Sequence, residues 1–189
     1  PFYQGSGGGI TLSGGEPLLY PQFTLGLLKK AKEEGIHTAL ETSLSIGPES
    51  LERHIDSLLS HVDELFCDIK APDEPSHFEW TGVALKTVLI NLKKVRALRL
   101  AQGRDCTLRV PLIPGHVCDK ETVTKVADLI KQHYPEAHLE LMPYNPLAAS
   151  KYARLGLSWN YPESLVSDKV IRECIVAARA GPANAPFGP

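Results

Sequence analysis

Short apolar runs alternate along this chain with longer stretches in which apolar residues recur every three or four positions. The apolar runs, which predict strands, lie at residues 9–12, 36–40, 65–70, 107–113 and 139–142. The periodic stretches, which predict helices with one buried stripe, lie at residues 23–31, 51–62, 85–95, 123–130 and 165–178. Strands that alternate with helices predict a parallel α/β sheet of about five βα units.

Local signals set the limits of several elements. Gly35 suits the end of the first helix, Pro48 the first turn of the second, and Asp119 the N-cap of a later one. Residues 145–161 are predicted to form a long loop, and the last helix is predicted to run from about residue 162 to residue 180. Residues 1–180 are expected to form one domain, and the Gly-, Pro- and Ala-rich residues 181–189 a disordered tail.

Polar residues gather where the predicted strands end. At these positions stand Gly14, Gly15, Glu16, Glu41, Thr42, Asp68, Lys70, Tyr144 and Asn145. The carboxyl ends of parallel strands meet at one edge of the sheet, which is where such folds bind ligands. Arg109 falls inside its strand, so its charge must face a lumen or pair with an anion. Together these residues predict a polar rim able to hold a small zwitterion or a phosphate.

Composition narrows the classes of partner and the compartment. The 189 residues carry 20 basic and 22 acidic side chains, a net charge of −2, and no basic patch dominates, which disfavours nucleic acid as a partner. The apolar runs are too short to cross a membrane, and no secretion signal is recognisable. The spacing of Cys67, Cys106, Cys118 and Cys174 fits neither a disulfide framework nor a zinc or cluster motif, so a reducing compartment, the cytoplasm, is expected. Cys67 and Cys174 lie in apolar stretches and are expected in the core.

Two glycine clusters, residues 7–9 and 14–15, flank the first strand. Glycine lets exposed backbone groups approach a ligand, although a turn at each end of the strand explains the clusters equally well. The spacing fits neither the phosphate loop Gly-x-x-x-x-Gly-Lys nor Gly-x-Gly-x-x-Gly. The acid that follows, Glu16, suits an ammonium group better than a phosphate, or it simply favours a helix N-terminus.

Residues 7–19, Gly-Gly-Gly-Ile-Thr-Leu-Ser-Gly-Gly-Glu-Pro-Leu-Leu, resemble the S-adenosylmethionine-binding segment of radical SAM enzymes. Further matches follow in the order of the family, at residues 35–42, 68–70, 73–82, 109–115 and 143–145. The match at 73–82 places Asp, His, Thr and Gly in an Asp-x-x-x-His-x-x-x-Thr-Gly pattern. Over about residues 5–155 the chain resembles more closely the activating enzymes of glycyl radical enzymes, such as the pyruvate formate-lyase activases.

This resemblance implies a partial parallel (β/α) barrel that binds S-adenosylmethionine along the carboxyl ends of its strands. The residues that would bind this cofactor are Gly14, Gly15, Glu16, Thr42, Asp68, Lys70, Arg109 and Asn145. In the family pattern residues 14–16 hold the ammonium group, Arg109 lies near the carboxylate, and Asn145 flanks the adenine or ribose. Glu41 and Asp68 position the sulfonium end through a monovalent cation.

The resemblance also implies an oxidoreductase whose cofactors carry the reaction. A [4Fe-4S] cluster gives one electron to the sulfonium, the S–C5′ bond breaks, and the 5′-deoxyadenosyl radical takes a hydrogen atom from a glycine of a partner glycyl radical enzyme. A flavodoxin or a ferredoxin-type protein is the expected electron donor. No acid–base residue is needed, and the sequence shows no catalytic residue beyond the cofactor site.

The chain departs from the family pattern at three places. It lacks the Cys-x-x-x-Cys-x-x-Cys loop, although three thiolates are the minimum for binding the cluster. We therefore expect a fragment that lacks the first βα unit and is inactive by itself. Ser43 and Leu44 stand where many relatives have a small residue and Gly, and Asn145 stands where some activases have His.

Two functions besides an activase stay open from the sequence. The chain could belong to another radical SAM enzyme that acts on a small molecule or RNA, or it could bind S-adenosylmethionine or a phosphate ligand without chemistry. A purely structural interaction protein is disfavoured, because polar groups gather at all five strand ends.

Overall fold

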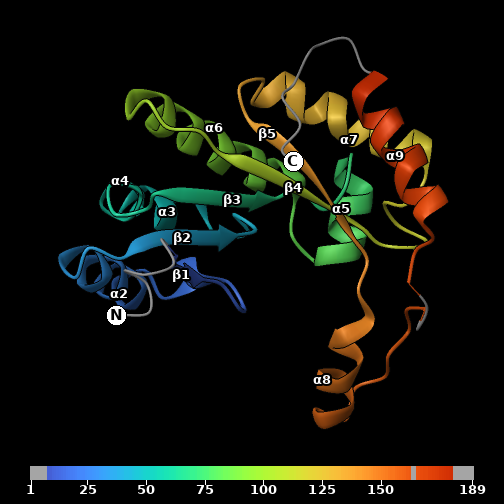
Figure 1. Cartoon of the computed structure of the whole chain (residues 1–189), viewed down its shortest axis with the longest axis horizontal. Helices are drawn as coiled ribbons and strands as arrows, with labels where there is room; N and C mark the ends of the chain where they lie inside the picture. The colour runs from blue at the N-terminus through green and yellow to red at the C-terminus, as the bar shows by residue number, and fades with distance from the viewer. Residues whose placement is uncertain (1–7, 163–164, 181–189) are drawn as a thin grey trace.

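The computed structural model describes residues 8–162 and 165–180, and in that part of the chain five strands form one sheet. The strands are β1 Gly9–Leu12, β2 His37–Thr42, β3 Glu64–Asp68, β4 Thr107–Leu112 and β5 His138–Pro143. They pair in sequence order, and every pair is parallel. Each crossover contains at least one helix (Figure 1), so the predicted parallel α/β sheet is confirmed.

Apart from α8 (Ala149–Arg154), the helices cover one face of the sheet (Figure 1). In the described residues they are α2 Pro21–Glu33, α3 Pro48–Glu52, α4 Ile55–Leu59, α5 Glu74–Thr81, α6 Leu85–Ala101, α7 Lys120–His133, α8 Ala149–Arg154 and α9 Asp168–Ala180, with short 3₁₀ turns η1 Pro17–Leu19 and η2 Pro146–Ala148. Among these helices α2 contacts α4, α4 contacts α6, and α6 contacts α7, while α9 packs against α7. Most residues of the stripes predicted from the periodicity face this core, but Phe23, Leu27 and Leu165, which were expected on those stripes, are exposed.

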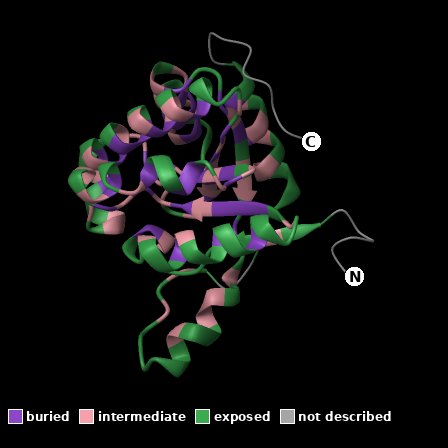
Figure 2. Cartoon of the chain, turned by 90° about the vertical axis from the view of Figure 1, so that its left-hand side faces the viewer, coloured by how far each residue is buried: buried purple, intermediate pink, exposed green. Residues whose placement is uncertain are grey.

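The two faces of the sheet differ because side chains alternate along each strand. The residues under the helices are apolar and buried, among them Leu40, Leu65, Cys67, Leu108, Val110 and Leu139. The residues of the opposite face are polar or only partly buried, among them Glu41, Phe66, Asp68, Arg109 and Glu140. We call this second face the open face. Figure 2 shows the buried residues concentrated along the strands and between strands and helices.

Two predicted helices differ from the observed ones. The buried stripe over residues 51–62 is present, but it is divided between α3 and α4, with Arg53 and His54 between them. The last helix begins six residues later than predicted, at Asp168. Ser167 accounts for that start, because its hydroxyl and its carbonyl accept hydrogen bonds from the N–H groups of Val170 (3.4 Å) and Ile171 (3.1 Å).

The Asp-x-x-x-His-x-x-x-Thr-Gly pattern builds helix α5. Asp73 caps the helix by accepting a hydrogen bond from the Ser76 N–H (2.9 Å), and Gly82 ends it with a φ of +72°. His77 is buried, and its Nδ1 lies 2.7 Å from the Val83 carbonyl oxygen. In this structure the pattern shapes and anchors a short helix that follows β3.

The four cysteines are free, and Cys67 and Cys174 are buried, as expected. The fold also brings the Cys106 Sγ within 3.8 Å of the Cys67 Sγ, a contact that their spacing in sequence does not predict. Among the described helices, none has the length and the apolar character needed to span a bilayer. The tail predicted at 181–189 lies outside the described residues.

Candidate functional site

The loop between β1 and η1 carries the paired glycines at the carboxyl edge of the sheet. Gly14 has a φ of +95°, in the left-handed region that favours glycine. Both Gly14 and Gly15 are exposed, and a Cβ at either position would meet nothing within 4 Å. The backbone groups of this loop are therefore open to a ligand.

Glu16 fixes this loop to the end of β2. Its Oε1 accepts hydrogen bonds from the Leu18 N–H (3.1 Å) and the Thr42 hydroxyl (2.7 Å). Its Oε2 accepts hydrogen bonds from the N–H (2.8 Å) and the hydroxyl (2.7 Å) of Ser43. Both carboxylate oxygens are thus used inside the protein. We call Glu16, Thr42 and Ser43 the Glu16 cluster.

The segment after β2 is held in a conformation that supports Ser43. Leu44 has a φ of +55°, the left-handed region in which glycine is favoured, and its side chain is fully buried. Asn91 of α6, itself buried, donates from Nδ2 to the carbonyls of Leu44 (2.9 Å) and Ile46 (2.8 Å). The loop therefore keeps a left-handed turn even though Leu stands where the family resemblance leads us to expect Gly.

On the open face Arg109 joins three strands. Its Nη1 donates to Glu41 Oε1 on β2 (2.7 Å), and its Nε donates to Glu140 Oε2 on β5 (2.7 Å). The guanidinium also lies 3.7 Å from the centroid of the Phe66 ring on β3. The Ser13 hydroxyl donates to the second oxygen of Glu41 (2.6 Å). We call these five residues the Arg109 cluster; it spans the open face from the β1 loop to β5.

Asp68 and Lys70 lie next to this cluster, at the carboxyl end of β3. Lys70 Nζ is 3.4 Å from Asp68 Oδ2, and the Lys70 side chain is 38% exposed. In the register of the sheet Asp68 is paired with Arg109. The ammonium group of Lys70 is therefore both close to a carboxylate and accessible from solvent.

The two carboxylates predicted to share a cation have pKa values shifted in opposite directions. The hydrogen bond from Ser13, aided by Arg109, lowers the pKa of Glu41 despite partial burial. Burial raises the pKa of Asp68, although Lys70 and Arg109 favour its charged form. Burial disfavours the charge of Arg109, but the hydrogen bonds to Glu41 and Glu140 outweigh that effect and raise the pKa of Arg109.

The structure divides the predicted site residues into separate groups. Thr42 is 4% exposed and its hydroxyl donates a hydrogen bond to Glu16, so its side chain supports the loop instead of lining an open surface. Glu41 and Arg109 meet on the open face, and Asp68 pairs with Lys70. Asn145 forms its side-chain hydrogen bond with the Leu147 N–H (3.0 Å) and caps η2, so no hydrogen bond of the described residues joins it to these groups.

Sequence reasoning missed Ser13, Ser43, Phe66, Asn91 and Glu140. Ser13 and Ser43 stand beside predicted residues, so their proximity to the rim was a usable signal. Phe66 and Glu140 occupy the open face beside Glu41 and Arg109, which only the strand register shows. Asn91 lies in the middle of α6 and has no signal in the sequence.

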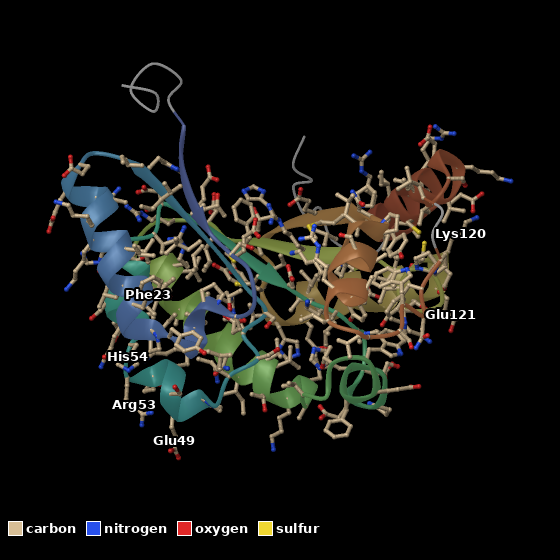
Figure 3. The ribbon with its side chains drawn as sticks, turned by 90° about the horizontal axis from the view of Figure 1, so that it is seen from below. Phe23, Glu49, Arg53, His54, Lys120 and Glu121 are labelled. Atoms are coloured by element: carbon tan, nitrogen blue, oxygen red, sulfur yellow. The ribbon has the colours of Figure 1, made fainter. Side chains whose placement is uncertain are left out.

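Two hollows lie beside residues of the Arg109 and Glu16 clusters. The larger, about 760 Å³, lies on the open face towards the amino ends of the strands and includes Phe66, Arg109 and Glu140 in its lining. The smaller, about 330 Å³, lies between residues 11–17 and α2 and includes Phe23. Figure 3 labels Phe23 on α2, on the opposite side of the view from Lys120 and Glu121 at the start of α7.

The described residues do not fit an iron–sulfur cluster. No three metal-ligating side chains come together among residues 8–162 and 165–180. Contact with Cys106 and burial raise the pKa of Cys67, and burial raises the pKa of Cys118 and Cys174, so the ligating thiolate form is disfavoured. Ligands for such a cluster are not provided by these residues.

Comparisons with known proteins agree with the fold. The sequence profile of the radical SAM superfamily matches residues 3–131. The pyruvate formate-lyase-activating enzyme of Staphylococcus aureus (strain USA300) is 32% identical over 161 residues, which cover 84% of this chain and 62% of that protein. The chain therefore spans 62% of the length of the curated relatives that it matches.

Solved structures show the same architecture. A domain of pyruvate-formate lyase-activating enzyme from Bacteroides vulgatus ATCC 8482 is similar with a TM-score of 0.70 and 26% identity, over 96% of this chain and 99% of that one. A radical SAM methyltransferase from Sphaerobacter thermophilus shares the fold, with a TM-score of 0.51 and 18% identity over 79% of this chain and 40% of that one. The profile covers more than half of the chain, and its matched range includes the glycine loop at the carboxyl edge of the sheet; the chain belongs to the radical SAM superfamily.

Proposed function

We propose that this chain is the S-adenosylmethionine-binding part of a glycyl radical enzyme activase of the pyruvate formate-lyase-activating type. The observation that carries the proposal is that the glycine loop after β1 and Asp68 and Lys70 at the end of β3 lie at the same carboxyl edge of a radical SAM sheet. The 32% identity to a pyruvate formate-lyase-activating enzyme supports the choice of reaction. Such a sheet binds its ligand at that edge.

The residues of this edge fit the amino-acid end of S-adenosylmethionine. An ammonium group needs acceptors, which the exposed carbonyls at Gly14 and Gly15 offer. A carboxylate needs a donor, which the accessible ammonium of Lys70 offers. Because both oxygens of Glu16 are already used, its role is to hold the loop and to place negative charge close to the ligand ammonium.

Arg109 would act through its neighbours. Its Nη1 and Nε are paired with Glu41 and Glu140, so it holds Glu41 beside Asp68 near the sulfonium end. A monovalent cation between Glu41 and Asp68 would have to share Glu41 oxygens that Ser13 and Arg109 already engage. Asn145, exposed at the end of β5, is assigned to the adenine or ribose.

A reduced [4Fe-4S] cluster held elsewhere would supply one electron to cleave the S–C5′ bond of S-adenosylmethionine, so that the 5′-deoxyadenosyl group could take a hydrogen atom from a glycine of the partner protein. The described residues do not hold that cluster, so we assign its thiolates to a segment outside these 189 residues. In this proposal the chain itself binds and orients the cofactor. A flavodoxin or ferredoxin-type electron donor belongs to the same proposal.

The test uses the full-length protein that contains this sequence, with its cluster reconstituted and with reductant, S-adenosylmethionine and purified pyruvate formate-lyase. We expect a glycyl radical signal in electron paramagnetic resonance together with 5′-deoxyadenosine. A Lys70→Met variant should bind S-adenosylmethionine about ten-fold more weakly, because a charge-assisted hydrogen bond is lost; Lys29→Met, an exposed site on α2, is the control. Formation of 5′-deoxyadenosine without the radical signal would indicate another radical SAM reaction, and the absence of both products would indicate a binding module.

A further inference from the structure

The segment between β5 and α9 carries a surface that the proposed function does not use. We define the arm as residues 145–161, which include η2 and α8. Figure 1 shows it extending away from the sheet beyond the carboxyl end of β5, and none of its residues is buried. Three of its leucines are well exposed: Leu147 at 76%, Leu155 at 72% and Leu157 at 55%. Large apolar side chains gathered in one exposed segment indicate an interaction site.

A chain of aromatic rings fixes the arm to the body of the protein. Trp80 of α5 packs edge-on against His116, with ring centroids 4.6 Å apart, and His116 lies 5.5 Å from Tyr161. Tyr161 lies 5.2 Å from Trp159, which in turn lies 5.0 Å from Tyr152 of α8. Such ring pairs stabilise their arrangement beyond the effect of the area they bury. The arm is therefore attached both near its end and at its helix.

A hydrogen bond closes the arm at its base. The Tyr144 hydroxyl, just before the arm, donates to the carbonyl of Pro162, just after it (2.6 Å). With its ends joined and its rings stacked, the arm presents its leucines in one arrangement. A surface ordered before binding loses less conformational entropy when a partner binds.

The charges of the arm indicate the chemistry of the partner. Residues 145–161 contain two basic side chains, Lys151 and Arg154, and no acidic one. Both basic side chains are exposed, and within the described residues neither has an ion-pair partner. Exposed leucines beside unpaired cations fit a partner surface that is apolar and acidic.

We propose that the arm docks the protein substrate, an acidic and apolar patch of the glycyl radical enzyme, and this inference rests on the proposed function. The arm starts at the carboxyl end of β5, the strand that pairs with β4 and with Arg109. A protein bound to it would lie at the same edge of the sheet as the cofactor residues. A second copy of this chain fits less well, because two arms would bring only positive charges together.

The test measures binding of the 189-residue chain to purified pyruvate formate-lyase by biolayer interferometry, at about 0.05 M and 0.5 M salt. The variant L147S/L155S/L157S should bind at least about ten-fold more weakly, as expected when central apolar anchors are removed. The matched control I90S/L100S/V176S alters exposed apolar residues of α6 and α9 and should change the affinity less than about two-fold.

A charge-reversal pair tests the electrostatic part. K151E/R154E should weaken binding about ten-fold at low salt and distinctly less at high salt, because salt screens exposed charges. The control K29E/K93E reverses two exposed lysines of α2 and α6 and should leave the affinity close to that of the wild type.

Several results would overturn the docking role. These are arm variants that bind as the wild type does, controls that weaken binding equally, no detectable binding of pyruvate formate-lyase, or an arm that instead drives dimerisation in sedimentation or binding to anionic vesicles. A separate titration with S-adenosylmethionine tells the two proposals apart. A chain that responds to the cofactor but not to pyruvate formate-lyase contradicts the docking role alone. A chain that binds pyruvate formate-lyase through the arm but ignores the cofactor supports docking and contradicts the proposed cofactor site.

Discussion

Two neighbouring residues of β2, Glu41 and Thr42, belong to two different polar clusters on opposite faces of the sheet. Thr42 is buried and contributes to the Glu16 cluster, in which every carboxylate oxygen accepts hydrogen bonds from inside the protein. Glu41 is only partly buried and contributes to the Arg109 cluster on the open face. The alternation of side chains along one strand thus separates residues that shape the loops from residues that border the ligand edge.

The two clusters also differ in how much their interactions are expected to contribute to folding stability. The Glu16 carboxylate receives four hydrogen bonds from neutral donors in a partly buried setting, and its removal would leave those donors unsatisfied. The carboxylates that pair with Arg109 are 33% (Glu41) and 46% (Glu140) exposed, and ion pairs that solvent reaches contribute little. Substitutions in the Glu16 cluster should therefore affect stability most, and those at the Arg109 cluster should affect ligand binding most.

The largest loss of stability is expected for Glu16→Ala. It deprives the Thr42 hydroxyl and both donors of Ser43 of their acceptor, so the free energy of unfolding should fall by about 3 kcal/mol. Urea denaturation followed by circular dichroism measures this, with Glu79→Ala, an exposed site on α5, as the control. If the two variants are equally stable, the Glu16 cluster does not hold the loops.

Asn91→Ala should have the next largest effect. It removes two hydrogen bonds to the carbonyls of Leu44 and Ile46 in a buried setting, which corresponds to about 2 kcal/mol of unfolding free energy. Asn160→Ala, at an exposed position, is the control for the same denaturation measurement. A loss no greater than in that control would mean that the loop after β2 keeps its path without α6.

The Asp63 carboxylate, at the amino end of β3, also accepts several hydrogen bonds, and the stability that it contributes should depend on pH. Burial opposes its charge, but hydrogen bonds from Lys32 (2.8 Å) and from Thr38 (2.9 Å) prevail and lower its pKa from 3.8 to about 2. Because the folded pKa is the lower one, the stabilisation is present above about pH 4 and is lost as the pH falls towards 2.

Asp63→Asn should therefore cost about 1–2 kcal/mol at pH 7 and much less at pH 2. The measurement is urea denaturation across this pH range, and Asp128→Asn, exposed on α7, is the control. A cost for Asp63→Asn that is the same at both pH values would contradict the assignment.

The smallest effect on stability is expected for Glu140→Gln, because Glu140 is 46% exposed. The free energy of unfolding should change by less than about 0.5 kcal/mol.

Arg109→Met should lower the free energy of unfolding somewhat more, by about 1 kcal/mol, and should weaken S-adenosylmethionine binding because Glu41 is no longer held. Calorimetry of Glu140→Gln and Arg109→Met measures both their affinity for S-adenosylmethionine and their stability. If Arg109→Met loses as much stability as Glu16→Ala, the two clusters do not differ in their contribution to stability.

The sequence was sufficient for the sheet, because five apolar runs separated by helical stripes leave few other arrangements. It also pointed to the carboxyl edge, since the glycine loop, Asp68 and Lys70 each follow a strand. It could not assign Thr42 to the buried side of the rim or connect Arg109 to Glu140, because both depend on which face a residue takes and on the register between strands.

The pattern of hydrophobic and polar residues could not predict contacts between segments that are distant in sequence. Asn91 supports a loop 45 to 47 residues earlier in the chain, and nothing around it marks it as different from other polar residues of α6. The arm was predicted only as a long loop, because the rings that hold it come from α5, from the loop before α7 and from the arm itself. Such aromatic packing has no local periodicity.

The most direct test of the account is a titration of the isotopically labelled 189-residue chain with S-adenosylmethionine, followed by two-dimensional NMR. Even weak binding is visible by this method. We predict chemical-shift changes at Ser13, Gly14, Gly15 and Lys70 that saturate, that are diminished in Lys70→Met, and that spare α7 and α9. The absence of any shift at millimolar ligand, or shifts confined to other parts of the molecule, would contradict the claim that the carboxyl edge of this sheet binds the cofactor.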